Sequence, residues 1–357
     1  MITNILSFIL VIGVVVFIHE LGHFLAAKSI GVRVEKFYLG FNLFGLGLKR
    51  KYKGTEYGIG LFPLGGYVKV AGIIDESMDT ESTGGPDEFR SKSTLGKIWI
   101  MSAGVMMNFV LAILIISYLT YHNGVNEPDP RAIIGQIMSE YPAASLGLQK
   151  GDQILSIDGI PITNWIEVTQ EIHSKPDVVI NFSWKRNKEI FTGSVKSVIA
   201  EQLPWNKKII QGMIGIAPMY EHRDVTIIES FKSGCMRTYY WLEITCRSLI
   251  AIITGDVSMK EMAGPIMIAK IAGDTASSGG ILALLGLMAI ISVNLGLINI
   301  LPIPGLDGGH VMIALIEGAI RRDLPIKVKL GIQQAGLLLI MILFIIIMFN
   351  DIQRLVQ

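Results

Sequence analysis

The stretch Phe17-Ile18-His19-Glu20-Leu21-Gly22-His23-Phe24-Leu25 lies inside the apolar segment that opens the chain and contains the pattern H-E-x-x-H. At about 100° per residue on a helix, His19 and His23 lie on one face, where both imidazoles can reach one metal ion. Glu20 lies beside them and can hold and deprotonate a metal-bound water without being a ligand. The pattern therefore predicts a hydrolytic zinc site.

The apolar setting of this pattern favours the metal site over a purely structural role. Ionisable side chains inside a membrane span are costly, and they mark functional sites by default. The alternative is that His19 and His23 are core histidines satisfied by hydrogen bonds. A single apolar helix does not supply the partners that this alternative needs.

The composition is that of a membrane protein. Of the 357 residues, 51% are hydrophobic and only 17% are charged, with a mean hydropathy of +0.51. Soluble domains carry about 25% charged residues. The net charge of +1 gives no support for nucleic-acid binding through a basic surface. Cys235 and Cys246 would lie roughly 16 Å apart on a helix, too far for a disulfide.

Four segments are long and apolar enough to cross a bilayer, which needs about 20 apolar residues. The first segment lacks a basic leader and a cleavage site of small residues, so we do not interpret it as a signal peptide. Basic residues cluster between the first and second segments and between the third and fourth, and the positive-inside rule places both loops in the cytoplasm. Both termini and residues 122–280 are then extracytoplasmic. The segments are 1–30, 98–121, 281–306 and 330–350, and the clusters are Lys49, Arg50, Lys51, Lys53, Lys92 and Lys97, and Arg321, Arg322, Lys327 and Lys329.

The first cytoplasmic loop, residues 31–97, contains an apolar stretch at about 56–70. Its alternation and glycines predict a β-hairpin with the turn at Pro63-Leu64-Gly65-Gly66. Non-helical backbone enters a membrane only where it is buried in protein or lines a cavity. We therefore expect a membrane re-entrant hairpin near the metal site, with a surface hairpin as the alternative. Residues 31–53 are expected to be irregular, and residues 74–93 polar and flexible.

The second span contains the run Met101-Ser-Ala-Gly-Val-Met-Met-Asn108. Its small residues allow a neighbouring helix to approach closely. Asn108 either orients a group in the metal site or makes an interhelical hydrogen bond.

Residues 126–200 have the strand and helix order of a small α+β domain that resembles a PDZ domain. The run Pro142–Gly159, with its Gly-Asp and Asp-Gly pairs, carries that resemblance. PDZ domains hold extended peptides by adding them to a sheet edge. The following segment, 205–280, contains a strand-like stretch at 213–218 and a helix of mixed polarity at 228–254. We expect that helix to lie in the membrane interface.

The third span ends in polar residues, prolines and glycines. Asp307 is a natural third metal ligand, because a catalytic zinc takes three protein ligands and leaves one position for water. His310 is a rival for this role. A third possibility is a plain turn in which Asp307 only caps the chain.

The pair HELGH (19–23) and N-x-x-P-x-P-x-L-D-G-G-H (299–310) resembles the site-2 proteases, which are intramembrane zinc metalloproteases of the peptidase M50 kind. Within this family the chain resembles the bacterial regulator-of-sigma-E protease type. Two departures are a single PDZ-like domain where some members have two, and Val105 where a proline is usual. The resemblance implies one Zn²⁺ held by His19, His23 and Asp307, with Glu20 as the catalytic base. It also implies substrate-binding roles, which fall on Asn294, Asn299, Pro302, Gly65 and Gly66.

The expected fold is therefore a polytopic α-helical membrane protein with four transmembrane helices, a re-entrant β-hairpin and one inserted PDZ domain. The expected activity is cleavage of transmembrane segments of single-span membrane proteins, such as anti-sigma factors or remnant signal peptides. A site-1-type protease would make the first, extracytoplasmic cut in the same substrate. The expected location is the bacterial inner membrane, with the zinc site towards the cytoplasm.

Two other functions compete with proteolysis. A non-proteolytic membrane PDZ scaffold that binds exported chains would not need the intact H-E-x-x-H. An ion or metal transporter would need polar residues along several spans, whereas here they gather near the cytoplasmic ends of the first and third spans.

Overall fold

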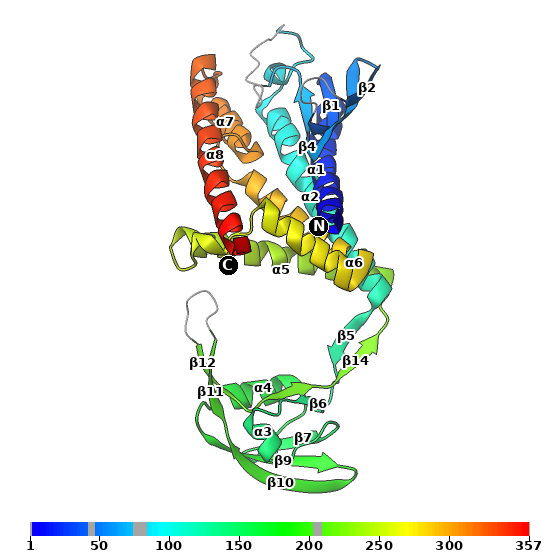
Figure 1. The fold of residues 1–357 in the computed structure, drawn as a ribbon, viewed down its shortest axis with the longest axis vertical. Coiled ribbons are helices and arrows are strands. Elements are labelled where there is room, and N and C mark those ends of the chain that lie inside the picture. Colours follow the sequence, from blue (N-terminus) through cyan, green and yellow to red (C-terminus); the bar gives the residue numbers. More distant parts are fainter. Residues whose placement is uncertain (1, 42–46, 74–83, 203–208, 357) are drawn as a thin grey trace. The chain divides into compact units, whose positions relative to one another are not determined.

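The computed structural model describes residues 2–41, 47–73, 84–202 and 209–356 (Figure 1). The chain forms two compact units. One unit, called the helical unit here, comprises Met1–Thr120 and Ile227–Gln357. The other, Tyr121–Thr226, is inserted between its two parts in the sequence and is called the PDZ-like unit.

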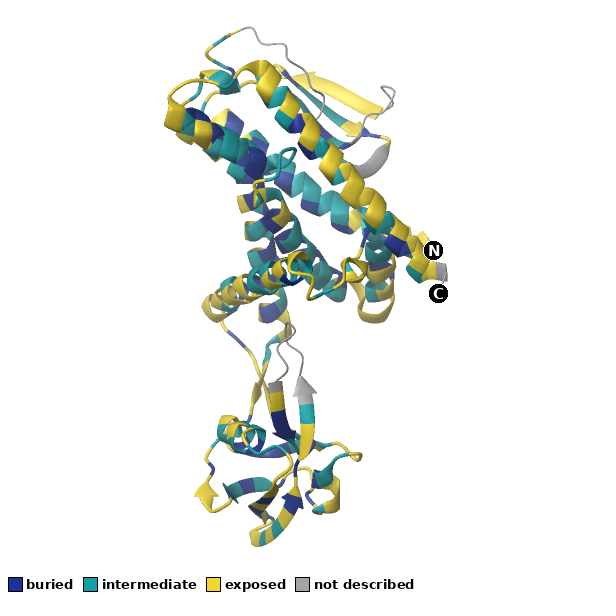
Figure 2. Cartoon of the chain, turned by 90° about the vertical axis from the view of Figure 1, so that its left-hand side faces the viewer, coloured by how far each residue is buried: buried dark blue, intermediate teal, exposed yellow. Residues whose placement is uncertain are grey.

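Four helices of the helical unit are long and apolar enough to cross a membrane, which confirms the four predicted spans. Figure 2 shows that the outward faces of the long helices are largely exposed. The exposed side chains in the middle of α8 are apolar, including Leu338, Ile342 and Phe344. Such a surface is stable against lipid and not against water. The four helices are α1 (Ile2–Ser29), α2 (Thr94–Asn123), α6 (Pro265–Ile300) and α8 (Ile326–Val356).

The helices α1, α2 and α6 pack around a common apolar core. Val15 of α1, Ala112 of α2 and Val293 of α6 are fully buried there. At the crossing of α1 and α2, a Cβ atom added to Gly22 would lie 2.4 Å from the carbonyl oxygen of Ala103. The small residues of the second span therefore allow the close approach that its sequence predicted.

The third span ends earlier than expected, and a separate helix follows it. The prediction of a span to residue 306 is wrong, because α6 ends at Ile300 and α7 (Asp307–Ile320) begins after a turn that contains Pro302 and Pro304. Proline lacks the N–H that would continue a helix. A Cβ on Gly308 would lie 2.2 Å from the carbonyl oxygen of Ile300, so the glycine lets α7 start directly against this turn.

The loop between α1 and α2 forms a four-stranded sheet, and the predicted hairpin at 56–70 is wrong. The sheet has the order β2-β3-β1-β4, with β1 parallel to β3 and antiparallel to β4. Because β1 lies between β3 and β4, these two strands do not pair, and Pro63–Gly66 lies within β4. The expected irregular segment 31–53 instead supplies β1 and β2. The strands are β1 (Val34–Phe41), β2 (Gly47–Tyr52), β3 (Thr55–Gly60) and β4 (Phe62–Val70).

The chain after β4 returns to the sheet before α2 begins. The amide of Phe89, in the 3-10 helix η2 (Phe89–Ser91), donates to the carbonyl of Ala71, and the amide of Arg33 donates to that of Asp87. The expectation of flexibility over 74–93 falls largely on residues 74–83, which lie outside the described residues.

Helix α5 (Ile227–Ile253) occupies the predicted position 228–254 and packs against α2 and α6. A Cβ added to Gly234 would lie 2.8 Å from the carbonyl oxygen of Ile113 on α2. The hydroxyl of Thr245 donates to the carboxamide oxygen of Asn294 on α6 at 2.7 Å. A position of α5 in the membrane interface stays a prediction.

The PDZ-like unit is built on a sheet of order β10-β9-β7-β8, covered by helix α4. Its predicted end at residue 200 is too early. Ile214 is 1% exposed in the core, and β13 pairs with β6. The segment after residue 200 that contains Ile214 and β13 therefore completes the PDZ-like unit. The strands are β5 (Val125–Pro128), β6 (Ile134–Ile137), β7 (Gln153–Ile157), β8 (Ile160–Pro161), β9 (Val179–Arg186), β10 (Glu189–Lys196), β11 (Val198–Gln202), β12 (Ile209–Met213), β13 (Ile216–Pro218) and β14 (Tyr220–Arg223), and the helices are α3 (Pro142–Ser145) and α4 (Trp165–His173).

Candidate metal centre

Helix α1 presents His19 and His23 to the interior of the helical unit. The two residues are 6% and 8% exposed, and their Nε2 atoms lie 3.2 Å apart. The Nδ1 atom of His23 lies 2.8 Å from the carbonyl oxygen of Ile100 on α2. A carbonyl only accepts, so Nδ1 carries the proton and Nε2 keeps a lone pair for a metal.

His19 has a buried amide as its second partner. The side-chain nitrogen of Asn108 lies 3.3 Å from Nδ1 of His19, and Asn108 is 0% exposed. Among the described residues, the carboxamide oxygen of Asn108 has no hydrogen-bond partner in this orientation. Oxygen and nitrogen of an amide are assigned from their hydrogen bonds. With the two exchanged, the oxygen accepts from Nδ1–H, and Nε2 of His19 becomes a ligand atom.

Asp307, the first residue of α7, completes the cluster. Its Oδ2 atom lies 3.2 Å from Nε2 of His19 and 3.3 Å from Nε2 of His23. This buried oxygen accepts no hydrogen bond of good geometry from the part of the chain that the structure describes. Zinc bonds of about 2.0–2.1 Å place tetrahedral ligands roughly 3.3 Å apart. The three atoms therefore fit one metal ion.

His310, the rival third ligand, lies outside the cluster that could hold a metal. Its Nε2 atom faces the side-chain amide of Gln333 on α8 at 3.4 Å. It still lines the same cavity as the three converging side chains.

Gly104 makes room for both histidines, a role that the sequence signalled only as a small residue in a span. A Cβ at this position would lie 2.3 Å from Nε2 of His23 and 2.7 Å from Cε1 of His19. Any larger residue at position 104 would therefore displace the imidazoles of His19 and His23.

The cluster opens into a cavity of about 340 Å³, which Glu20 also lines. Strand β4 forms one wall. A Cβ on Gly66 would lie 2.7 Å from the carbonyl oxygen of Tyr38 and 3.6 Å from Cγ of Glu20, so only glycine lets the strand come this close. Asn299 points its side-chain nitrogen to within 3.3 Å of Nε2 of His19.

Comparison with known proteins agrees with this geometry. Residues 7–343 match the model of peptidase family M50. The chain belongs to this family. A relative from Rickettsia conorii, named provisionally as a zinc metalloprotease, is 36% identical over 99% of both chains. Another so named, from Campylobacter jejuni, is 34% identical over 98% of this chain and 94% of its own. Zinc metalloprotease RasP of Geobacillus kaustophilus is 28% identical over 98% of both.

The M50 chain is thus a multi-pass membrane zinc metalloprotease, as the resemblance implied. Among solved structures, the chain is similar to the PDZ domain of an SdrC-like protein from Listeria monocytogenes. The two are 23% identical, and the match covers 27% of this chain and 94% of that domain with a TM-score of 0.22.

Some of the expected substrate-binding residues of the M50 chain do not reach the cavity. Gly66 and Asn299 line the cavity. Among the described residues that line it, Asn294, Pro302 and Gly65 do not occur. Asn294 faces α5 and accepts from Thr245. Residues five apart on a helix differ by about 140° in direction, so Asn294 and Asn299 cannot both face one cavity.

Proposed function

We propose that this chain hydrolyses a peptide bond inside, or next to the cytoplasmic end of, a transmembrane segment. His19, His23 and Asp307 would hold one Zn²⁺, which when bound lowers the pKa of its water towards ~7 and polarises the scissile carbonyl. The convergence of these three ligand atoms within 4.8 Å, inside a unit of membrane-spanning helices, carries the proposal.

Glu20 is the general base of this proposal. It lines the same cavity as the three ligands and follows His19 directly in the helix. Its carboxylate takes a proton from the attacking water and delivers it to the leaving amide nitrogen. Because this carboxylate is not a metal ligand, it can carry the proton from the water to the leaving group.

Strand β4 would hold the substrate in an extended form. A helical substrate hides its carbonyls in i to i−4 hydrogen bonds and must unwind before cleavage. One edge of β4 pairs with β1, and among the described strands none pairs with its other edge. Gly66 and Tyr67 of β4 line the cavity. An unwound segment can therefore add to this edge beside the metal centre, where Asn299 can bond its backbone.

The substrates would be single-span proteins, such as anti-sigma factors or remnant signal peptides, already cut outside the membrane by a site-1-type protease. We place the chain in a bacterial inner membrane, with its termini and PDZ-like unit extracytoplasmic. The basic loops between the spans support this topology. A folded unit between the second span and α5 would exclude intact ectodomains by its volume, and a role in stress responses follows from anti-sigma substrates.

Trapping tests this function against the scaffold alternative. Glu20→Gln keeps the zinc ligands but removes the base, so cleaved-once substrates should accumulate on the variant in membranes. Proteomics of the purified complexes should show single-span proteins with shortened ectodomains, enriched over wild type. Equal recovery of intact exported proteins with both forms would favour the scaffold.

A further inference from the structure

A second hollow of the helical unit lies on the other side of α1 from the metal centre. It has a volume of about 430 Å³ and is called the β2 groove here. Phe17 borders it, and Phe17 lies about 200° around the helix from His19. Its apolar lining is Phe17, Phe37, Leu39, Leu48, Tyr57 and Ile59, and its polar border is Lys49 and Arg50.

The register of the sheet explains the apolar lining. Leu48 of β2 is opposite Ile59 of β3, and Leu39 of β1 is beside Ile59. Paired residues of neighbouring strands project from the same sheet face. Phe37 of β1 lies on this face too, with its ring centroid 5.7 Å from that of Phe17. The apolar face is therefore continuous with the surface of a membrane-spanning helix.

This face is open along its outer part. Leu48 is 78% exposed and Ile59 is 57% exposed. Large aliphatic side chains exposed side by side are unfavourable in water and mark a surface that another apolar body covers. Because Phe17 belongs to a helix long and apolar enough to cross a membrane, that body is in contact with the bilayer.

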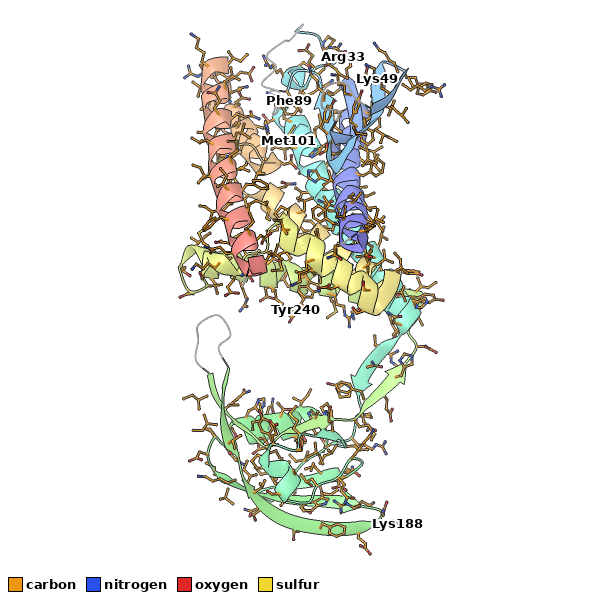
Figure 3. The ribbon with its side chains drawn as sticks, viewed as in Figure 1. Arg33, Lys49, Phe89, Met101, Lys188 and Tyr240 are labelled. Carbon is orange, nitrogen blue, oxygen red and sulfur yellow. The ribbon has the colours of Figure 1, made fainter. Side chains whose placement is uncertain are left out.

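The border of the β2 groove is strongly basic. Lys49, Arg50, Lys51 and Lys53 follow one another on β2 and its turn, and all four are exposed. Figure 3 shows Lys49 at the outer margin of the sheet. Glu56, which is opposite Lys51 in the register, is one carboxylate beside these four cations, so the border keeps a net positive charge.

We propose that the β2 groove binds an anionic phospholipid. The acyl chain lies along Phe17, Leu48 and Ile59, and the phosphate contacts Arg50, which projects from the same sheet face as Leu48, while Lys49 beside it adds positive charge. Arginine matches phosphate with paired hydrogen bonds, and basic residues next to a membrane attract anionic headgroups. An occupant that is apolar in the groove and negatively charged at its border is an amphiphile, and an anionic phospholipid has this form.

A lipid bound in the groove affects the cleavage site through the sheet. Strand β2 pairs with β3, β3 with β1, and β1 with β4, which forms the wall of the metal cavity. A lipid that orders β2 and β3 therefore also orders β4. This consequence for cleavage rests on the proposed function, whereas lipid binding itself does not.

Lipid binding is tested with the full-length protein in detergent by native mass spectrometry. Phosphatidylglycerol and phosphatidylcholine of equal chain length are the probes, and glycerol 3-phosphate is the competitor. The test variant is Lys49→Gln/Arg50→Gln. The control, Arg322→Gln/Lys327→Gln, removes the same charge from the other basic loop at exposed positions.

We expect wild type and the control to retain phosphatidylglycerol over phosphatidylcholine, and the test variant to retain it about tenfold less. Leu48→Gln should also weaken retention while leaving one zinc per chain, which shows that the helical unit is folded. Equal losses of phosphatidylglycerol in the test variant and the control would mean that retention depends on general surface charge. That result would overturn the proposed site. Full retention by the test variant, equal binding of both lipids, or displacement by glycerol 3-phosphate at the lipid's own concentration would overturn it as well.

Discussion

The carboxamide of Asn108 on α2 lies 3.3 Å from Nδ1 of His19 on α1, and both side chains are buried. A histidine that binds metal through Nε2 carries its proton on Nδ1, which needs an acceptor. Asn108 supplies that acceptor from a different helix. The geometry of the metal centre therefore depends on the packing of α1 against α2.

Replacing Asn108 tests this dependence. Asn108→Leu leaves Nδ1–H of His19 without an acceptor, and we expect zinc affinity to fall about 10- to 100-fold. Asn108→Asp keeps an acceptor oxygen and should stay within a few-fold of wild type. Chelator competition measures both values. Unchanged affinity in the leucine variant would reduce Asn108 to an interhelical contact.

Gly104→Ala should remove zinc from the protein, because the added methyl group would lie 2.3 Å from Nε2 of His23. Gly286→Ala is the matched control in another span, where the nearest atom, on Leu119, would be 3.8 Å away. The control should keep zinc and gain up to about 1 kcal/mol in stability. Metal analysis and thermal unfolding check both variants. Full zinc content in Gly104→Ala would show that α2 can move away from the histidines.

The third ligand is tested by comparing Asp307 with His310. Asp307→Ala should lose both zinc and proteolysis, because two imidazoles alone hold the ion weakly. His310→Ala should keep one zinc per chain. The opposite pattern of zinc content would assign the third position to His310.

The PDZ-like unit should lose stability in acid through Asp129. Hydrogen bonds from Arg131 at 2.9 and 2.7 Å lower the pKa of Asp129 to about 2. Because the folded pKa lies below the unfolded value of about 3.9, this contribution is full above pH ~4 and is lost as pH falls through 2. Asp129→Asn should therefore reduce the stability difference between pH 5 and pH 2.5 by about 1 kcal/mol. Denaturant unfolding of the full chain, followed by tryptophan fluorescence, measures it, with Glu140→Gln as control. An identical pH dependence in wild type and Asp129→Asn would contradict this role.

The chemistry of the site could be predicted because single residues carry it. A histidine pair in an apolar helix, and Asp307 after the third span, are costly enough to imply a shared purpose. Pairing across distance was not predictable. The apolar run 56–70 suggested a hairpin, but its two strands, β3 and β4, each pair with β1 and not with each other. The contact of Gly104 with His23 joins positions far apart in the sequence, so only a small residue in a span could be recognised beforehand, without its partner.

The central claim is that the buried cluster holds a catalytic zinc and that Glu20 moves the proton. It is tested most directly by measuring zinc per chain and cleavage of a single-span reporter, for wild type and Glu20→Gln in lipid vesicles. We predict one zinc in both proteins, and cleavage by wild type alone. Cleavage by Glu20→Gln at the wild-type rate, with zinc retained, would contradict the account.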